Sequence, residues 1–257
     1  MSPELRDLLD AARAAAREAG AAILEIYATE FAVRRKGDAS PVTDADERAE
    51  AIILAALGKA APEIPVIAEE SVARAGAPGA APPRYWLVDP LDGTKEFVAR
   101  NGEFTVNIGL IEQGRPVLGV IHVPVRGTTY AAAGPGSATR QVGDAPPVAI
   151  AARLAPARPV IVHSRSHAKS RRLAEYLAAH PASQALISGS AVKFCLVAEG
   201  SADLYPRFGE TMEWDTAAGQ AILEAAGGSV TTPDGAALRY GKTGFRNSDF
   251  LARGRSA

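Results

Sequence analysis

The stretch that decides the fold of this chain is Asp89-Pro90-Leu91-Asp92-Gly93-Thr94, which follows the apolar run Tyr85-Trp86-Leu87-Val88. The apolar run predicts a buried strand, and the turn formers Pro and Gly predict that this strand ends in a turn. Asp89 and Asp92 would then lie at the carboxyl end of the strand, both free to point at one spot. Two such carboxylates suit Mg²⁺, and without a cation they would repel one another. Taken alone, the stretch is equally compatible with a polar turn that closes a hairpin.

Three further acidic residues also lie where elements begin or end. Glu69 follows a short apolar run at 64–68, and Asp215 opens a helical run that reaches Ala226. Asp46 lies in the first turn of a helix predicted from about Asp44. In proteins of the α/β class, catalytic and ligand-binding residues commonly lie at such ends of helices and strands. For Asp215 the alternative role is helix capping, because the helix dipole favours a negative charge in the first turn.

These segments, in this order, resemble the inositol monophosphatase superfamily of Mg²⁺-dependent, lithium-sensitive phosphatases, and the resemblance covers nearly the whole chain. It implies a layered αβαβα sandwich of mixed α+β and α/β type, with two or three bound Mg²⁺ ions. The implied metal ligands are Glu69, Asp89, Asp92 and Asp215, with the backbone carbonyl of Leu91. The pair that activates the attacking water falls on Thr94 and Asp46.

The residues that follow Thr94 indicate the substrate branch. Lys95-Glu96-Phe97 and the block from Gly189 to Gly200 resemble the 3′(2′),5′-bisphosphate nucleotidases, the CysQ-type branch of the superfamily. Inositol phosphatases tend to carry an acid near the position of Arg207. A guanidinium at this point inverts the charge and favours a second anionic group, which it can hold bidentately.

A nucleoside 3′,5′-bisphosphate has such a second phosphate. One phosphate would lie on the metal ions and the other against Lys193 and Arg207, while Ser190 would share a face with Lys193 at a helix start. The alternative for Lys193 is a solvated helix position, and for His167 a surface-loop histidine. The substrate contacts implied by the resemblance are Gly93, Thr94, Ser164, His167, Gly189, Ser190, Lys193, Arg207 and Asp215.

The implied activity is Mg²⁺-dependent hydrolysis of the 3′-phosphate of adenosine 3′,5′-bisphosphate by a metal-activated water. The analogue 3′-phosphoadenosine 5′-phosphosulfate is a second implied substrate, and in sulfur assimilation this reaction removes an inhibitory by-product. One alternative is an inositol 1-phosphate or fructose 1,6-bisphosphatase of the same superfamily, against which Lys95-Glu96-Phe97 and Arg207 argue. A second is a non-catalytic metal or nucleotide sensor, which would not need Asp46 and Thr94. A third is a structural Ca²⁺ site, but the acids are not clustered in one EF-hand loop.

Composition limits the class of protein. The chain has 257 residues, of which 47% are hydrophobic, so it can build the core of one or two intimately packed domains. A net charge of −1 gives no reason to expect a nucleic acid polymer as partner, and no apolar run approaches a transmembrane span. The single Cys195 precludes an internal disulfide and lies in an apolar run, which favours a core position in a cytoplasmic protein. Either a monomer or a homodimer is compatible with the sequence.

The hydrophobic pattern predicts two halves. Residues 1–150 form an α+β half that carries most of the metal ligands, and residues 151–257 form an α/β half that completes the metal and nucleotide site. Expected in the first half are helices over 3–28 and 44–57, a strand near 31–35, a flexible loop over 73–83, antiparallel strands over 105–112, 116–123 and 128–132, and a loop over 134–143. Expected in the second half are strands over 160–164, 185–188, 203–205 and 229–231, helices over 169–179, 191–199 and 214–226, and an irregular tail.

Overall fold

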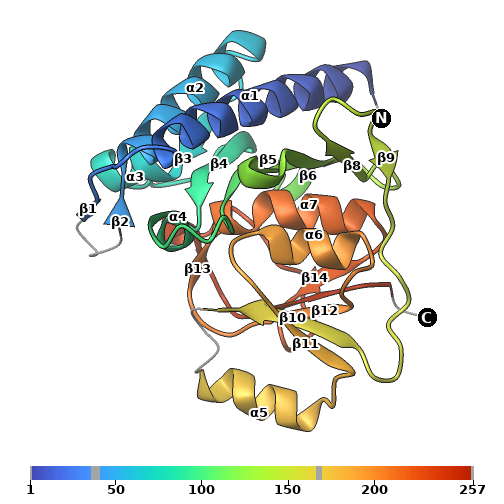
Figure 1. Ribbon diagram of the computed structural model, residues 1–257. Helices are drawn as coiled ribbons and strands as arrows, with labels where there is room; N and C mark the ends of the chain where they lie inside the picture. The colour runs from blue at the N-terminus through green and yellow to red at the C-terminus, as the bar shows by residue number, and fades with distance from the viewer. Residues whose placement is uncertain (1, 36–40, 166–169, 256–257) are drawn as a thin grey trace.

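Five layers make up the computed structural model, which describes residues 2–35, 41–165 and 170–255. Helices α1 (Pro3–Tyr27) and α2 (Asp44–Ala60) cover one face of a seven-stranded sheet (Figure 1). Helices α6 (Val192–Ala198) and α7 (Ala217–Ala225) lie between this sheet and a five-stranded sheet, and α5 (Arg171–Ala179) covers the outer face of the second sheet. The expected αβαβα sandwich is confirmed.

The first sheet carries Asp89 and Asp92 on β4, its second strand. Its strand order is β3-β4-β5-β6-β7-β8-β9, and only the β3–β4 pair is parallel. The strands are β3 (Val66–Ala68), β4 (Arg84–Asp92), β5 (Thr105–Glu112), β6 (Arg115–Val123), β7 (Thr128–Ala133), β8 (Thr139–Val142) and β9 (Val148–Ala149). The predicted antiparallel meander is confirmed. The loop predicted over 134–143 is wrong for residues 139–142, because β8 continues the meander there and its residues alternate between half-buried and exposed.

The second sheet mixes parallel and antiparallel pairs. Its order is β11-β10-β12-β16-β14, with β10 parallel to β11 and β12, and β16 antiparallel to β12 and β14. The strands are β10 (Val160–Ser164), β11 (Gln184–Ser188), β12 (Leu204–Arg207), β14 (Ser229–Thr231) and β16 (Phe250–Arg253). The irregular tail was therefore a wrong expectation, since β16 fills the gap between two strands that come earlier in the chain. The proposed division at residue 150 lies between the two sheets and stays a prediction.

Short elements complete the fold around the sheets. Helix α3 (Glu69–Ala75) begins directly after β3, and α4 (Thr94–Val98) begins directly after the Asp89–Gly93 segment. Neither helix was predicted, because each has only one or two turns and is too short to show a helical pattern of apolar residues. The remaining strands form two pairs, β1 (Arg34–Arg35) with β2 (Pro41–Val42) and β13 (Thr211–Met212) with β15 (Arg246–Asn247).

Close packing of α7 on the first sheet ties the two sheets together. A Cβ atom on Gly119 of β6 would lie 2.3 Å from the carbonyl oxygen of Ala218, so only glycine lets the helix approach this closely. Helix α7 is buried on nearly all sides, and its hydrophobic residues join the core between the sheets. This contact fixes the position of Asp215, which lies two residues before α7.

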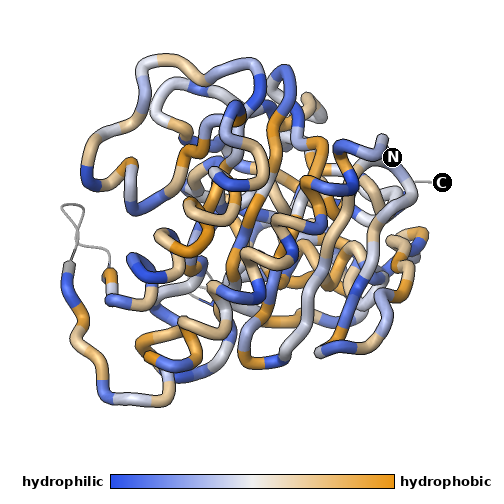
Figure 2. Tube along the Cα trace, turned by 90° about the horizontal axis from the view of Figure 1, so that it is seen from above, coloured by the Kyte–Doolittle hydropathy of each residue, from blue (hydrophilic) through white to orange (hydrophobic). Residues whose placement is uncertain are grey.

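The hydrophobic residues lie mainly inside the layers. Figure 2 shows orange residues along the central strands and blue residues at the outer turns. Helix α1 begins at Ser2, whose Oγ accepts a hydrogen bond from the N–H of Leu5 at 3.1 Å, and it buries a stripe of alanines against the sheet and α2. Cys195 is buried and free, as expected for a core residue. Within the described ranges, no helix is long and apolar enough to cross a bilayer.

Candidate active site

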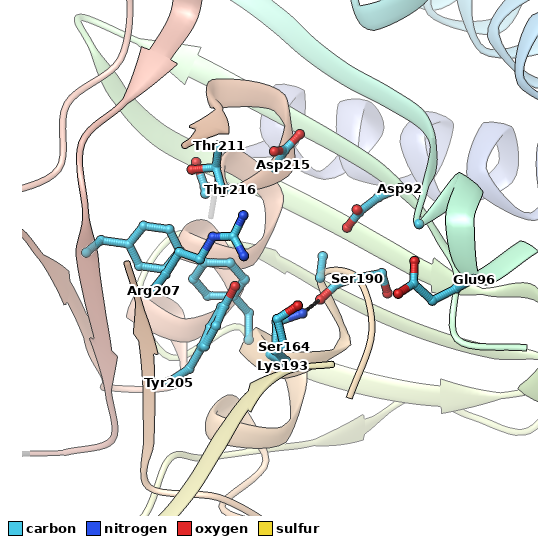
Figure 3. A pocket seen from close by; sticks show the side chains of 14 residues that line it. Asp92, Glu96, Ser164, Ser190, Lys193, Tyr205, Arg207, Thr211, Asp215 and Thr216 are labelled. Atoms are coloured by element: carbon cyan, nitrogen blue, oxygen red, sulfur yellow. Dashed lines mark hydrogen bonds between the residues drawn. The ribbon is translucent and has the colours of Figure 1, made fainter. Parts of the chain in front are cut away.

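Two adjoining pockets lie where the edge of the first sheet meets the second sheet, and they share Asp92, Gly93, Glu96 and Asp215 as lining residues. We name them by their charge. The acidic compartment is further lined by Glu69, Asp89, Leu91 and Thr94, and by Pro41 and Lys95. The cationic compartment is further lined by Ser164, Ser190, Lys193, Tyr205 and Arg207. Figure 3 shows Asp92 and Glu96 on one side of the cationic compartment and Arg207 and Tyr205 on the other.

Strand β4 aims two carboxylates into the acidic compartment. The strand does not stop before Asp89, as the turn residues had suggested, but continues to Asp92 with an irregular register between these two residues. In a regular strand, residues three apart point to opposite faces, and a bulge removes this restriction. Asp89 also accepts a hydrogen bond on Oδ1 from the N–H of Leu91 at 3.1 Å. The predicted convergence of Asp89 and Asp92 therefore depends on a bulge and not on a strand end.

The carboxylates of the acidic compartment carry negative charge that their surroundings do not neutralise. Burial raises the pKa of Asp89 well above its usual range, and the negative charges of Glu69, Asp92 and Asp215 raise it further. Burial also raises the pKa of Asp215, with Asp92 and Glu69 adding to the effect. For Asp92, burial raises the pKa to about 6, against the opposing effect of the Lys193 ammonium. Burial and mutual repulsion therefore both disfavour the ionised form of these carboxylates.

The donor set of this compartment fits a hard divalent cation. The negative charges of Glu69 and Asp92 lie close enough to Asp89 to disfavour its ionised form. Within residues 2–35, 41–165 and 170–255, no three His, Cys, Asp or Glu side chains already form a metal-binding group. The available atoms are nevertheless carboxylate and carbonyl oxygens, which are the ligands that Mg²⁺ prefers, and a cation would offset the repulsion between the carboxylates.

Thr94 and Asp46 form a hydrogen-bonded pair beside the acidic compartment. Thr94, the first residue of α4, donates from Oγ1 to Asp46 Oδ1 at 3.1 Å, with Leu91 O as a second acceptor at 3.3 Å. The other carboxylate oxygen of Asp46 accepts from the N–H and the hydroxyl of Thr43, both at 2.8 Å, in the capping box of α2. Asp46 is buried and fixed by these bonds, so its contact with Thr94 is preorganised.

Asp215 does not cap α7. It ends a short 3₁₀ turn (Glu213–Asp215), and its Oδ2 accepts from the N–H of Met212 at 2.9 Å. The N-cap of α7 is Thr216, and the helix begins at Ala217, later than the predicted start at residue 214. The capping alternative is therefore wrong for α7, and the carboxylate of Asp215 lies in the wall between the two compartments.

Lys193 is buried at the base of the cationic compartment. Its Nζ donates to the carbonyl oxygens of Ser188, at 3.4 Å, and Ser190, and lies 5.1 Å from the ring centre of Tyr205. Burial lowers the pKa of Lys193 to about 8, although Asp92 opposes this shift, and the positive charge of Arg207 lowers it as well. The alternative of a solvated helix position is wrong.

Among the residues that the structure describes, two buried polar atoms of the cationic compartment have no hydrogen-bond partner. They are Oγ of Ser190 and Nε of Arg207. Nη2 of the same guanidinium donates to the carbonyl oxygen of Glu210 at 2.9 Å. Ser190 precedes α6 with a φ of 45° instead of sharing a helix face with Lys193. Unmatched hydrogen-bond donors next to two cations are suited to an anion such as phosphate.

Of the other predicted substrate contacts, some line the pockets and others do not. Ser164, the last residue of β10, lines the cationic compartment, and Gly93 lines both compartments. Gly189 lines neither pocket; its N–H donates to Glu103 Oε2 at 3.0 Å, and it supports the adjacent Ser190. His167 lies outside the described residues.

Several buried or partly buried polar residues that support the site were not predicted. Glu50 of α2 accepts from the N–H of Glu70 at 2.8 Å and from Ser71 Oγ at 2.7 Å, which fixes the start of α3 next to Glu69. Asn107 of β5 donates to Asp92 Oδ2 at 3.3 Å. A single Asn in an otherwise apolar strand could have indicated from the sequence that Asn107 has a polar partner. For Glu50 the only available signal was an acid among the apolar residues of a helix, and the contact itself joins distant parts of the chain.

Comparisons with known proteins agree on one family. A sequence model described as the inositol monophosphatase family matches residues 4–254. The 3′(2′),5′-bisphosphate nucleotidase CysQ of Salmonella typhimurium is 48% identical over 245 residues, which cover 88% of this chain and 90% of that protein. The crystal structure of CysQ from Bacteroides thetaiotaomicron has a TM-score of 0.80 and 39% identity, covering 96% of both chains. An inositol monophosphatase from Anabaena has a TM-score of 0.76 and 30% identity, covering 98% of this chain and 92% of that one.

Proposed function

This chain belongs to the inositol monophosphatase family, and from this premise we propose that it is a 3′(2′),5′-bisphosphate nucleotidase. It hydrolyses the 3′-phosphate of adenosine 3′,5′-bisphosphate to give AMP and phosphate, and it acts in the same way on 3′-phosphoadenosine 5′-phosphosulfate. The observation that carries this proposal is the pocket itself, in which an acidic and a cationic compartment share lining residues. An inositol monophosphate has one anionic group and would leave Lys193, Arg207 and the buried Ser190 hydroxyl without a match.

The acidic compartment is proposed to hold two or three Mg²⁺ ions. The ligands are the carboxylates of Glu69, Asp89, Asp92 and Asp215 and the carbonyl oxygen of Leu91. Mg²⁺ held by these residues would offset the negative charge of the phosphate ester oxygens and would lower the pKa of the attacking water. The raised pKa values of Asp89 and Asp215 support this assignment, because buried carboxylates that repel one another are stabilised by a cation. The superfamily that the sequence resembles is lithium-sensitive, so the proposal also includes inhibition of this enzyme by Li⁺.

Thr94 and Asp46 are proposed to remove the proton from the attacking water. Because the Thr94 hydroxyl already donates to Asp46, its oxygen lone pairs are left to accept a hydrogen bond from water. As the new P–O bond forms and the ester P–O bond breaks, the proton of the water moves to Thr94 Oγ1, and the Thr94 proton moves to Asp46. The capping bonds from Thr43 hold the Asp46 carboxylate in place during this transfer.

The cationic compartment is proposed to bind the 5′-phosphate, which does not react. Lys193 and Arg207 supply the positive charge, and the Ser190 hydroxyl donates a hydrogen bond. Binding energy from a remote group of this kind orients the 3′-phosphate for in-line attack. A substrate that lacks the 5′-phosphate would lose this contribution.

Phosphate release from three substrates at equal concentration tests the proposal. We expect Mg²⁺-dependent release from adenosine 3′,5′-bisphosphate to exceed release from inositol 1-phosphate and fructose 1,6-bisphosphate. Preference for inositol 1-phosphate would contradict the assignment of the cationic compartment. Preference for fructose 1,6-bisphosphate would retain a site for two phosphates but would contradict a nucleotide substrate. The Asp46→Asn variant, prepared in the same way, controls for contaminating phosphatases.

A further inference from the structure

Glu96 occupies the junction between the two compartments. It lies in α4, two residues after Thr94, and it lines both pockets. Figure 3 shows it next to Asp92 and Ser190 and across the cationic compartment from Arg207. It belongs to the Lys95-Glu96-Phe97 segment, and none of the roles described above uses its carboxylate.

Gly189 leaves room for this side chain, and Gly93 lies in contact with it. A Cβ atom on Gly189 would lie 2.9 Å from Glu96 Cγ, and one on Gly93 would lie 3.4 Å from Glu96 Oε2. Within the described ranges, the structure gives the Glu96 carboxylate no hydrogen bond or ion pair, although it lies close enough to Lys193 and Asp92 to affect their pKa values. The carboxylate is thus placed in the pocket by its backbone and by the glycines beside it, and it is available to a ligand.

The charge of Glu96 restricts what can lie against it. An ionised carboxylate accepts hydrogen bonds and cannot donate them. It would repel both phosphates of the substrate, which lie on either side of it in the proposed binding mode. The part of the ligand that faces Glu96 must therefore be a hydrogen-bond donor located between the two phosphates. In a nucleoside 3′,5′-bisphosphate, the atoms between the phosphates belong to the ribose, and its one free hydroxyl is on C2′.

We propose that Glu96 accepts a hydrogen bond from the ribose hydroxyl next to the scissile phosphate and so distinguishes ribose from 2′-deoxyribose. The inference rests on the proposed function and specifies which part of the sugar is recognised. The same contact serves a 2′,5′-bisphosphate, because the free hydroxyl is then on C3′ and again lies next to the phosphate that reacts. One carboxylate at this position thus accommodates either position of the scissile phosphate.

The experiment compares kcat/KM for adenosine 3′,5′-bisphosphate with kcat/KM for its 2′-deoxy analogue. The proteins are the wild type, Glu96→Gln, Glu96→Ala and the control Glu175→Gln, which removes an exposed carboxylate paired with Arg171 on α5. Because both substrates are measured on one preparation, partial unfolding of a variant lowers both values together and leaves their ratio unchanged.

We expect the wild type and the control to prefer the ribonucleotide by at least roughly tenfold, as for a hydrogen bond to a charged group. In Glu96→Ala the ratio should fall to about one, and in Glu96→Gln, whose amide oxygen still accepts, it should lie between these values. A Glu96→Ala ratio equal to that of the wild type would overturn the inference while leaving the proposed function intact. A higher Mg²⁺ requirement with an unchanged ratio would also overturn it, because Glu96 would then be a metal ligand. Absence of hydrolysis of either nucleotide by the wild type would overturn the proposed function and the inference with it.

Discussion

The acidic and cationic compartments are adjacent, yet they are stabilised in different ways. In the acidic compartment, burial and the neighbouring carboxylates raise the pKa of Asp89 and of Asp215. In the cationic compartment, Lys193 and Arg207 donate to backbone carbonyl oxygens, which satisfy part of their hydrogen-bonding capacity. Like charges repel in both compartments, and neutral donors also reach the carboxylates of Asp89, Asp92 and Asp215. The acidic compartment differs because the pKa values of these three carboxyl groups are raised, so a bound cation would stabilise it.

This difference corresponds to two proposed roles, which are binding of the phosphate that reacts and binding of the phosphate that does not. In the proposed binding mode, the acidic compartment holds the metal ions and the phosphate that reacts, so its residues should matter for every phosphate ester. The cationic compartment holds the phosphate that does not react, so its residues should matter only for substrates with a second phosphate. Placing unmatched charges of one sign in a buried site lowers stability unless a ligand compensates for it. The two compartments can therefore be tested separately.

The largest effect is expected for Asp92→Asn in the acidic compartment. We expect turnover of both bisphosphate and monophosphate substrates to fall at least roughly a hundredfold, since even changes around a metal ligand cost this much. The variant should unfold at no lower temperature than the wild type in the presence of EDTA, because it carries less of the charge that repels Asp89 and Asp215. Phosphate release and thermal unfolding measure the two effects. Turnover near that of the wild type would exclude Asp92 as a metal ligand.

A smaller and more selective effect is expected for Arg207→Ala. The value of kcat/KM for adenosine 3′,5′-bisphosphate should fall about tenfold or more, because a charge-assisted contact to phosphate is lost. Adenosine 3′-monophosphate, which lacks the second phosphate, should be hydrolysed almost as before. Arg171→Ala, an exposed arginine on α5, is the matched control. Equal losses on both substrates would show that the two compartments do not act separately.

The pH dependence of kcat/KM distinguishes the compartments by the charge of Lys193. This parameter reports the pKa values of the free enzyme. The pKa of Lys193 is lowered to about 8, so its positive charge is present below pH 8 and is lost as the pH rises through this value. We expect kcat/KM for the bisphosphate to decline above pH 8, and the decline to disappear in Lys193→Arg, since arginine stays protonated. The same decline with adenosine 3′-monophosphate would contradict the assignment of Lys193 to the second phosphate.

The smallest effect is expected for Glu103→Ala, which acts on the cationic compartment from a distance. Glu103 precedes β5 and accepts from the N–H of Gly189 at 3.0 Å and from Arg165, so it joins the two sheets beside Ser190. We expect KM for the bisphosphate to rise a few-fold, with kcat nearly unchanged. Arg165→Ala removes only an exposed ion pair and should have little effect, because such pairs contribute about 0–1 kcal/mol. A drop in kcat for Glu103→Ala without a change in KM would place its influence in the acidic compartment instead.

Local patterns predicted much of this arrangement. The acids of β4 and of the segments near Asp46, Glu69 and Asp215 stand next to short apolar runs, so the sequence placed them at the ends of elements, and the structure brings them together. Lys193 and Arg207 were associated because a charge inversion near Arg207 indicated a second anion. These signals are local in sequence, and the contacts that they predict do not depend on the exact register of the sheets.

Long-range contacts explain what the sequence did not reveal. Strand β16 has four residues, and its place between β12 and β14 is set by partners far earlier in the chain. Glu50 and Glu103 hold backbone N–H groups that lie 20 and 86 residues away, so neither contact leaves a pattern in sequence spacing. The bulge between Asp89 and Asp92 is a feature of strand pairing, for which the residues Pro90 and Gly93 had suggested a simple turn.

The central claim is that the two compartments bind the two phosphates of one nucleotide. Its most direct test is the ratio of kcat/KM for adenosine 3′,5′-bisphosphate to that for adenosine 3′-monophosphate, measured for the wild type with saturating Mg²⁺. Both substrates present the same 3′-phosphate to the acidic compartment, and only the first reaches the cationic one. We predict a ratio of at least roughly ten, the factor expected from one charge-assisted phosphate contact. A ratio near one would contradict the claim, because the cationic compartment would then contribute nothing to the recognition of the substrate.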